Sequence, residues 1–530
     1  MRLYSDIVRL RIGKAVRKNS VLRYAEIVED VVKDGKRTTR LLKYLGPVRT
    51  EGDVERYRKM LALEKRRMSV EKADIRDLDI LPHRNFGMIY SSSLISSPLT
   101  KVFDLMGKHR DIIFLSVVSR LVHPGSDLSL INFLDRSYYP SVSELKKDAI
   151  YEALDALMAK KNEIEMAIVK ALKPDLKRVY YDLTSTYFEG KEKNDLVMFG
   201  YSRDKKRGKK QINIGLMMAD GIPIHHQVFP GNTIDPKTLK PIHTDLRKKF
   251  HVGRVIFIGD RAFGRKPSLT YLDRNEYITA VYRWDQPYRN TLMSTVFGEE
   301  HYHKELELHA MEVKVKWNTK DLTSSEKKRT RKRRAIAVYS AEREKEDVAD
   351  IEEKEKIVNE IISSGKKGTD LIKALGKLRT YTKNKGKEID VSRIETVKKL
   401  AGRFMIVSDA DLSVEEIVKG YKDLWKIERS FRTIKSFIEI RPVYHRKEER
   451  IEAHVFVAVL SFLMARLFEN ALNNTMTIAR ISETLSELEA IPVRTEAGTI
   501  FLRTEADKAR TLMEKINIPY PNKMLGYVVT

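Results

Sequence analysis

Three carboxylates of this chain occupy positions from which they could act together. Asp182 ends a short apolar strand within RVYYDLT (residues 178–184), and Asp260 ends another within RVIFIGD (residues 254–260). Glu428 lies far downstream, in an amphipathic segment. An acid at the mouth of a buried strand is costly unless it is paired or binds a metal ion. The three residues together therefore suggest a cation site built from carboxylates.

Such a site predicts divalent-metal chemistry. Two acids on neighbouring strands would raise each other's pKa by like-charge repulsion unless a divalent cation lay between them. Mg²⁺ prefers oxygen ligands and keeps several waters, so a few carboxylates and a substrate phosphate would complete its shell. Two such ions about 3.5–4 Å apart could activate an attacking oxygen and stabilise a leaving one. The structural alternative is that Asp182 and Asp260 cap the turns that follow them, which each acid taken singly fits better.

The segment around Glu428, residues 420–441, has the pattern of a single helix. Its apolar residues recur at spacings of three and four, which is typical of a core-facing helix. They are Leu424, Ile427, Phe431, Ile434 and Ile438. Tyr421, Glu428 and Lys435 recur every seven residues and would share one flank of the buried face, with a drift of only ~20° per step. This row could hold a metal ion and a phosphate backbone, although the segment taken alone fits an ordinary amphipathic helix better.

The composition indicates a polyanionic partner. The 530 residues include 100 Lys and Arg against 74 Asp and Glu, which gives a net charge of +26. A field of that sign attracts nucleic acid. No lipidation motif, signal peptide or apolar run of ~18 residues is evident, so we expect no membrane association. The sequence contains no cysteine, which excludes thiolate metal sites and fits a cytoplasmic, nucleoid-associated protein.

The elements that must position the acids alternate between strands and helices. From residue 174 the pattern predicts three strands, a helix, a strand, a helix and a strand, with a hairpin turn at Asp220-Gly221. A helix is expected to open at Asp235-Pro236. This order matches a mixed α/β sheet of ribonuclease-H type, in which acids at strand ends meet one from a later helix. The predicted fold class is therefore α/β, with a ribonuclease-H-like catalytic domain interrupted by an insertion domain.

We predict six regions along the chain. They are an N-terminal region with a β-hairpin around Asp34-Gly35 and a charged helix (1–101), a helical region that could bind DNA (102–173), the first part of the catalytic domain (174–284), the insertion domain (285–402), the second part of the catalytic domain with the Glu428 helix (403–470), and a C-terminal helical region (471–530). The basic runs at residues 203–210 and 327–334 are either phosphate-binding loops or solvated surface loops.

These motifs together resemble the DDE transposases of prokaryotic insertion sequences, in the branch with an insertion domain before the catalytic glutamate. That branch carries a Tyr-x2-Arg-x3-Glu-x6-Lys signature, and Tyr421, Glu428 and Lys435 match its spacing, whereas Leu424 stands where the arginine is expected. YYDLTSTYFEG around Asp182 is similar to the first aspartate motif of the family, and IGDRAFG around Asp260 is similar to the second. Further similar stretches are GYSRD (200–204), Gln211 and FPGNTIDPKTL (229–239).

The resemblance implies a metal-dependent recombinase that binds the terminal inverted repeats of an element, cleaves there, and joins the freed 3′-OH to target DNA. Asp182, Asp260 and Glu428 would hold Mg²⁺ or Mn²⁺, with two ions expected. The DNA contacts would come from Tyr421 and Lys435, with Arg429 or Arg432 in place of the missing arginine. A homodimer is expected, because two ends must be joined in one complex.

Two other functions are compatible with the same residues: a ribonuclease-H-like nuclease without strand transfer, and a catalytically dead DNA-binding derivative, against which the presence of all three acids argues. Within the transposase interpretation, Trp284 or Trp317 could stack on an extruded base, with burial in the core as the alternative. Asp204 is a candidate auxiliary residue. His225 and His226 are adjacent on a strand, so we predict that they point to opposite faces and do not chelate as a pair.

Overall fold

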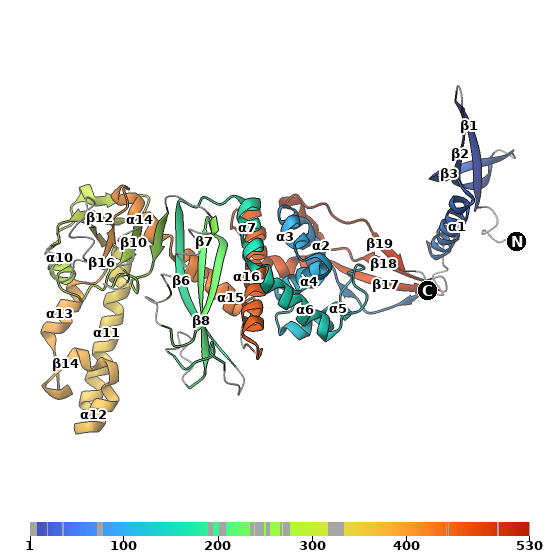
Figure 1. The fold of residues 1–530 in the computed structure, drawn as a ribbon. Helices are drawn as coiled ribbons and strands as arrows, with labels where there is room; N and C mark the ends of the chain where they lie inside the picture. Colours follow the sequence, from blue (N-terminus) through green and yellow to red (C-terminus); the bar gives the residue numbers. More distant parts are fainter. Residues whose placement is uncertain are drawn as a thin grey trace. The chain divides into compact units, whose positions relative to one another are not determined.

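The chain folds into two compact units, which Figure 1 shows as a ribbon. Unit 1 comprises residues 1–94, 132–143 and 475–530, and unit 2 comprises residues 95–131 and 144–474. The computed structural model describes residues 8–17, 20–33, 36–71, 78–188, 194–200, 208–233, 238, 249–250, 255–265, 268, 276–315, 333–440, 443, 445–495 and 498–528.

The N-terminal part of unit 1 is a three-stranded antiparallel sheet with one helix. Its elements are β1 (Val8–Arg17), β2 (Ser20–Lys33), β3 (Lys36–Pro47) and α1 (Glu51–Glu71). Ala25, Val48 and Tyr57 form the small core between the sheet and the helix. The predicted pairing of β2 with β3 is confirmed, although the Asp34-Gly35 turn lies outside the described residues.

The rest of unit 1 is a second antiparallel sheet with three helices. The elements are β4 (Asp79–Ile80), β5 (Arg84–Asn85), α2 (Gly87–Ile95), α17 (Ile478–Ser486), β17 (Glu489–Thr495), β18 (Gly498–Arg503), α18 (Asp507–Lys515) and β19 (Met524–Val528). The strand order is β19-β18-β17-β4, and β5 also pairs with β17. We expected a helical region over residues 471–530, and three strands accompany its two helices. Much of β17 alternates between buried and less buried residues, which is the period of a half-buried strand.

Unit 2 is built on one mixed sheet of nine strands. In sheet order these are β11 (Tyr302–His303), β12 (Leu308–Val313), β13 (Arg334–Tyr339), β16 (Arg403–Ser408), β10 (Glu276–Ala280), β9 (Ile256–Gly259), β6 (Arg178–Tyr187), β7 (Gln211–Ala219) and β8 (Ile222–Pro230). Only β10 with β9 and β9 with β6 pair in parallel among these described strands. The predicted hairpin between β7 and β8 is confirmed, and its turn residues Asp220 and Gly221 have φ values of 49° and 74°. The helix expected after Asp235-Pro236 falls largely outside the described residues.

Helices pack on this sheet or on one another. They are α3 (Thr100–Asp104), α4 (Arg110–Val122), α5 (Leu130–Asp135, which begins in unit 2 and ends in unit 1), α6 (Lys147–Ala159), α7 (Lys161–Leu172), α10 (Tyr288–Ser294), α14 (Val414–Lys422), α15 (Trp425–Ser436) and α16 (Glu448–Ala471). Helix α14 contacts β9, β10, β12 and β16, α15 contacts β6, and α16 contacts β8, α4 and α6. Helix α16 is long and apolar enough to cross a membrane, contrary to our expectation of no such segment, but 83% of its most apolar window is buried in the protein. It is therefore a core helix of the protein.

The segment between β10 and β16 contributes to the sheet and also forms a helical projection. Strands β11, β12 and β13 extend the nine-stranded sheet, so this part shares the core that holds the candidate acids. The projection consists of α11 (Ala341–Ser363), α12 (Gly368–Leu375), the strand pair β14 (Thr382–Lys383) and β15 (Glu388–Ile389), and α13 (Val391–Lys399). Two small apolar clusters of its own hold it together.

Candidate active site

Asp182 lies near the middle of β6, not at the end of its strand as predicted, and Asp260 directly follows the last residue of the adjacent β9. Strands β6 and β9 pair in parallel with Tyr181 opposite Gly259, so the next residue on each chain is one of the two acids. Neighbouring strands are about 4.8 Å apart, and residues in register on parallel strands point to the same face. The sheet therefore brings the two predicted aspartates side by side, which is the arrangement that a shared cation requires.

Both acids face the side of the sheet that α14 and α15 cover. Side chains alternate along a strand, so Asp182 shares a face with Tyr180, and Asp260 shares a face with Ile258. Ile258 belongs to the core beneath α14, and Tyr180 packs against that same core. Helix α15 contacts β6. Glu428, on α15, is thus carried by the element that covers the face of the two aspartates.

The aspartates also make backbone contacts. Asp260 Oδ1 accepts a hydrogen bond from the Ala262 N–H (2.9 Å), and Asp182 Oδ1 accepts one from the Leu183 N–H (2.7 Å). The contact of Asp260 is the turn cap that the sequence left open. Capping uses one carboxylate oxygen, so it does not exclude a second role for the other oxygen.

Tyr421 connects the acids electrostatically. It is the next-to-last residue of α14 and packs, partly buried, against the core beneath that helix. Burial, together with the nearby Asp260 and Glu428 carboxylates, raises the pKa of Tyr421 above its usual range. Tyr421 therefore lies within electrostatic reach of both acids. Arg343 and Arg261 act in the opposite direction on this pKa.

The prediction of one helix from residue 420 to residue 441 is wrong. Helix α14 ends at Lys422, and α15 begins at Trp425. The intervening turn is tighter than an α-helix, because the Leu424 N–H bonds to the Tyr421 carbonyl and the Ile427 N–H to the Leu424 carbonyl, three residues back in each case. The seven-residue row is thereby divided: Tyr421 belongs to α14, whereas Glu428 and Lys435 belong to α15.

The apolar stripe of this segment is confirmed. All five of its members are at most 5% exposed: Leu424, Ile427, Phe431, Ile434 and Ile438. Glu428, Arg429 and Arg432 are exposed, and Lys435 is partly exposed. Leu424 is thus a packing residue and supplies nothing in place of the arginine of the signature.

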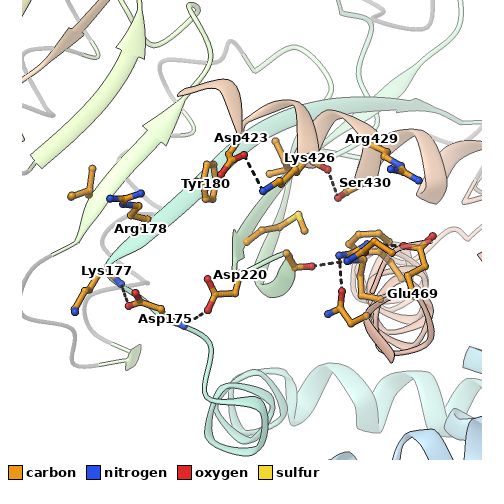
Figure 2. Close-up of a pocket in the computed structure, with 18 of the residues that line it drawn as sticks. Asp175, Lys177, Arg178, Tyr180, Asp220, Asp423, Lys426, Arg429, Ser430 and Glu469 are labelled. Carbon is orange, nitrogen blue, oxygen red and sulfur yellow. Dashed lines mark hydrogen bonds and ion pairs between the residues drawn. The ribbon is translucent and has the colours of Figure 1, made fainter. Parts of the chain in front are cut away.

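A cavity of about 1260 Å³ opens beside α15 but not at the acids (Figure 2). Arg178, at the start of β6, lines it together with Tyr180, Lys426 and Arg429. Neither Asp182, Asp260 nor Glu428 lines it. Several of its charges are internally balanced, for example by the ion pairs of Arg178 with Glu416 and of Lys426 with Asp423. Of the predicted site residues, only Arg429 borders this cavity.

The secondary candidates have different outcomes. Trp284 packs against the small core of the projection, and the guanidinium of Arg393 lies 4.0 Å from the centre of its ring. This environment agrees with the packing alternative for Trp284. Trp317, Asp204 and most of the basic runs 203–210 and 327–334 lie outside the described residues.

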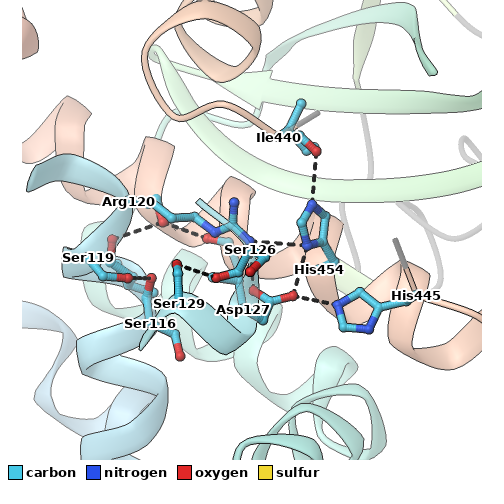
Figure 3. A network of polar contacts seen from close by, with 12 residues as sticks. Ser116, Ser119, Arg120, Ser126, Asp127, Ser129, Ile440, His445 and His454 are labelled. Atoms are coloured by element: carbon cyan, nitrogen blue, oxygen red, sulfur yellow. Dashed lines mark hydrogen bonds and ion pairs between the residues drawn. The ribbon is translucent and has the colours of Figure 1, made fainter. Parts of the chain in front are cut away.

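A buried polar network around Asp127 was not predicted (Figure 3). Asp127 begins the short 3₁₀ helix after α4, and Arg120 Nη2 donates to its Oδ1 (2.7 Å). His445 Nε2 lies 2.6 Å from Asp127 Oδ2, and His454 Nδ1 lies 2.8 Å from the same oxygen. His454 Nε2 donates to the Ile440 carbonyl (2.9 Å). The network thereby ties the segment after α15 to α4 and α16.

The charge of Asp127 is balanced by residues of the chain. Burial alone would raise the pKa of Asp127, but the charges of His454 and Arg120 hold it well below its usual range. Burial lowers the pKa of His454, and Asp127 opposes that shift. The ligand atoms of Asp127, His445 and His454 lie within 4.8 Å of one another, which is a possible metal-binding set. Arg120 Nη2, however, lies 3.1 Å from His454 Nδ1 and already supplies the positive charge.

The prediction that His225 and His226 point to opposite faces is wrong. The pairing of β8 shifts register between Met217 and Met218 of β7, which inserts a bulge, and bulges re-aim side chains. Both imidazoles reach Glu165 of α7, with His225 Nδ1 2.7 Å from Oε2 and His226 Nδ1 3.0 Å from Oε1.

The protonation states in this second cluster follow from burial. Lys249 also pairs with Glu165. Burial, with the nearby Lys161, lowers the pKa of His226 to about 3, so His226 is neutral at pH 7. The Glu165 cluster is thus another carboxylate that residues of the chain itself satisfy. No periodic pattern in the sequence could have linked Glu165 or Asp127 to these partners.

The comparison with protein families assigns the chain to a class. A family model described as the transposase DDE domain matches residues 182–464, more than half of the chain. The chain therefore belongs to the DDE-domain transposases. The matched range begins at Asp182 and also contains Asp260 and Glu428. No curated protein sequence matches the chain.

Solved structures of other transposases align with the chain at low similarity. One is the piggyBac transposase synaptic complex with hairpin DNA, at 10% identity and a TM-score of 0.37, covering 84% of this chain and 89% of that one. Another is the Mos1 transposase paired-end complex with the left transposon end, at 14% identity and a TM-score of 0.15, covering 44% of this chain and 67% of that one. A Mos1 mariner paired-end complex with Mn aligns at 16% identity and a TM-score of 0.15, covering 43% and 66%.

Proposed function

We propose that this chain is the transposase of a prokaryotic insertion sequence, which cleaves DNA at the element ends and joins the 3′-OH ends to target DNA. The observation that carries the proposal is the parallel register of β6 and β9, which sets Asp182 beside Asp260. Like charges at that spacing on a partly buried surface favour a bound divalent cation. Family membership supports the general activity.

The residues that would hold Mg²⁺ or Mn²⁺ are Asp182, Asp260 and Glu428. Their carboxylate oxygens suit hard divalent cations, and the first two face the side of the sheet that Glu428's helix covers. When bound, two such ions would polarise the scissile phosphodiester and lower the pKa of the attacking oxygen. The protein's own part is positional: β6 and β9 fix two ligands on rigid strands, and α15 carries the third.

The DNA contacts proposed for this site come from both sides of the break between α14 and α15. The Tyr421 phenol can donate a hydrogen bond to a phosphate oxygen. Lys435, Arg429 and Arg432 would contribute positive charge on α15. We place the chain in the branch with the Tyr-x2-Arg-x3-Glu-x6-Lys signature. Because Leu424, at the arginine position, is buried, we propose that Arg429 or Arg432 takes the role of that arginine.

Assembly and fold detail complete the proposal. A ribonuclease-H-like core with an insertion between β10 and β16 fits the mixed order of the sheet. We propose that a homodimer synapses two inverted repeats in the cytoplasm, on the nucleoid. Short inverted repeats on either side of the gene, bounded by direct repeats, would support this proposal without an experiment on the protein.

A strand-transfer assay tests the function directly. The substrates are a duplex whose terminal inverted repeat ends in a free 3′-OH and a supercoiled plasmid target, with Mg²⁺ or Mn²⁺. Wild-type protein is expected to give joined products, and Asp182→Asn none, while Asp155→Asn, an exposed aspartate outside the site, should behave as wild type. Hydrolysis without joining would favour the nuclease alternative. Joining by Asp182→Asn at the wild-type rate would overturn the site assignment.

A further inference from the structure

The helical projection of unit 2 separates its charges along its length. Its stem is α11, whose 23 residues carry nine acids and four cations, a net charge of −5. Its tip, which we define as residues 364–388, carries eight cations and two acids, a net charge of +6. The cations are Lys366, Lys367, Lys373, Lys377, Arg379, Lys383, Lys385 and Lys387. A solvated helical hairpin has no need of such a division, because mixed charges would keep it equally soluble.

The tip presents its cations to solvent. All eight are exposed. Lys383 lies 3.8 Å from Glu388, and none of the other seven forms an ion pair with a residue that the structure describes. An unpaired surface cation retains its full attraction for a polyanion. The acidic stem, in contrast, pairs its own lysine Lys354 with Asp350.

The tip has an apolar core and a defined backbone conformation. Val358, Leu371 and Leu375 form its apolar core, against which Leu378 and Tyr381 pack. Sharp turns close it: Gly376 ends α12 at φ 50°, and Gly386 has φ 92° with Leu375 Cδ1 2.8 Å from where a Cβ would lie. These positions require glycine. The lysines are therefore held on a defined surface.

The stem sets the distance of the tip from the sheet. Helix α11 follows β13 directly, and the Ser340 N–H just before it bonds to the Gly402 carbonyl beside β16. Figure 1 shows α12 at the end of α11 away from β16. At 1.5 Å per residue, 23 residues span about 34 Å. That length matches about one helical turn, or about 10 base pairs, of B-DNA.

We propose that the tip binds the phosphate backbone of duplex DNA about one helical turn from the sheet that carries Asp182 and Asp260. This inference rests on the proposed function for the identity of the partner. Seven lysines and one arginine make up the cations of the tip, and its one aromatic side chain, Tyr381, packs against the apolar core. Such a surface suits sequence-independent phosphate contact, which fixes register on the duplex without reading bases. The projection would thus provide a second contact with the DNA, on the duplex that flanks the reacting phosphodiester.

The salt dependence of binding tests the proposal without relying on cleavage. The probe is a labelled 40-base-pair random-sequence duplex, and the protein is the full chain. Each phosphate contact contributes about 0.9 to the slope of log K against log salt. Lys377→Gln with Arg379→Gln is therefore expected to reduce the magnitude of the slope by up to about 2 and to weaken binding several-fold at low salt. The matched control, Lys345→Gln with Lys356→Gln on the stem, removes the same charge and should leave the slope nearly unchanged.

A tethered cleavage reagent tests the distance. Because the sequence has no cysteine, Thr369→Cys can carry a single iron–EDTA group on the tip. Scission centred about 10 base pairs from the protein's own cut is expected. Absence of tethered scission, with the protein's own cut intact, would overturn the tip proposal and leave the proposed function standing.

Equal slopes for the tip and stem variants would also overturn the proposal. So would a tip variant that changes only sedimentation, because the basic tip would then dock on the acidic stem of a second copy. Preference for an RNA duplex of the same length in competition would reject DNA as the partner.

Discussion

Asp127 and Asp182 are almost equally inaccessible, at 6% and 9% exposure, yet the neighbours that the structure describes for them differ. Asp127 meets Arg120, His445 and His454, so cationic and hydrogen-bonding groups of the chain surround its charge. Asp182 has another carboxylate, Asp260, beside it on the next strand. One acid is placed for stability, and the other is placed where like charges meet. The difference teaches that burial alone does not identify a candidate metal ligand.

The largest expected effect is on catalysis. Asp182→Asn and Asp260→Asn should each reduce strand cleavage by about 10³-fold, because a lost metal ligand costs several kcal/mol of transition-state stabilisation. Their unfolding free energy should stay equal or rise, since a like-charge contact is removed. Cleavage assays paired with urea denaturation measure both. If Asp182→Asn lowered the unfolding free energy together with the cleavage rate, Asp182 would be a residue that stabilises the fold, like Asp127, and not a metal ligand.

The next effect is on stability. Asp127→Asn should lower the free energy of unfolding by about 3–5 kcal/mol, because it leaves buried Arg120 without its counter-charge. Asp155→Asn is the control. Asp155 forms an ion pair with Arg450 and its side chain is about half exposed, and such exposed pairs contribute at most about 1 kcal/mol. Urea unfolding curves compare the two. Equal losses would mean that the Asp127 network is no more important than a surface ion pair.

Acid should destabilise the histidine-containing clusters before it protonates the aspartates. The pKa of His226 is lowered to about 3, whereas an unfolded histidine has a pKa near 6.5. The unfolded state therefore binds the proton first, and stability present above pH ~6.5 is lost as the pH falls towards 3, by up to about 1.4 kcal/mol per pH unit. His454, whose pKa is also lowered, acts in the same direction.

The His226→Gln variant isolates this effect. Its unfolding free energy should fall less steeply between pH 6.5 and pH 5 than that of the wild type, and chemical denaturation at several pH values measures the slope. Parallel curves would show that His226 does not remain neutral in the folded protein.

The smallest expected effect is stabilisation by divalent cations. At about ten times its Kd, Mg²⁺ or Mn²⁺ should raise the unfolding free energy of the wild type by about 1.4 kcal/mol. Asp182→Asn should lose this increment, and Asp127→Asn should keep it. Thermal unfolding with and without EDTA gives the comparison. A cation effect that disappears in Asp127→Asn would locate the metal in the histidine-containing network instead.

What the sequence could reveal depended on local patterns. Apolar runs predicted the strand that carries Asp182 and the strand that precedes Asp260, and three-and-four spacing predicted the buried stripe along α15. These signals are local because strand and helix periods repeat within a few residues. The register of β6 with β9 was not readable. The prediction that Asp182 ends its strand is wrong, because β6 continues to Tyr187 and Asp182 lies near its middle.

The missed features depend on distant or irregular contacts. His454 is 327 residues from Asp127, and no spacing rule connects such residues. The bulge in β8 and the tight turn at Asp423 and Leu424 are single-residue departures from ideal geometry, which periodicity averages out. The addition of β11, β12 and β13 to the sheet is likewise a matter of edge pairing that their own sequences do not specify.

The three candidate acids of unit 2 are synthesised at different times. Strands β6 and β9, which position Asp182 and Asp260, are both complete once residue 260 has been synthesised. Glu428 follows 168 residues later (428 − 260). A ribosome adding about 5–20 residues per second takes roughly 8–34 s to cover that interval. The lysine-rich tip at residues 364–388 is made within it. During synthesis, the lysine-rich tip is therefore present in the growing chain before Glu428 is added.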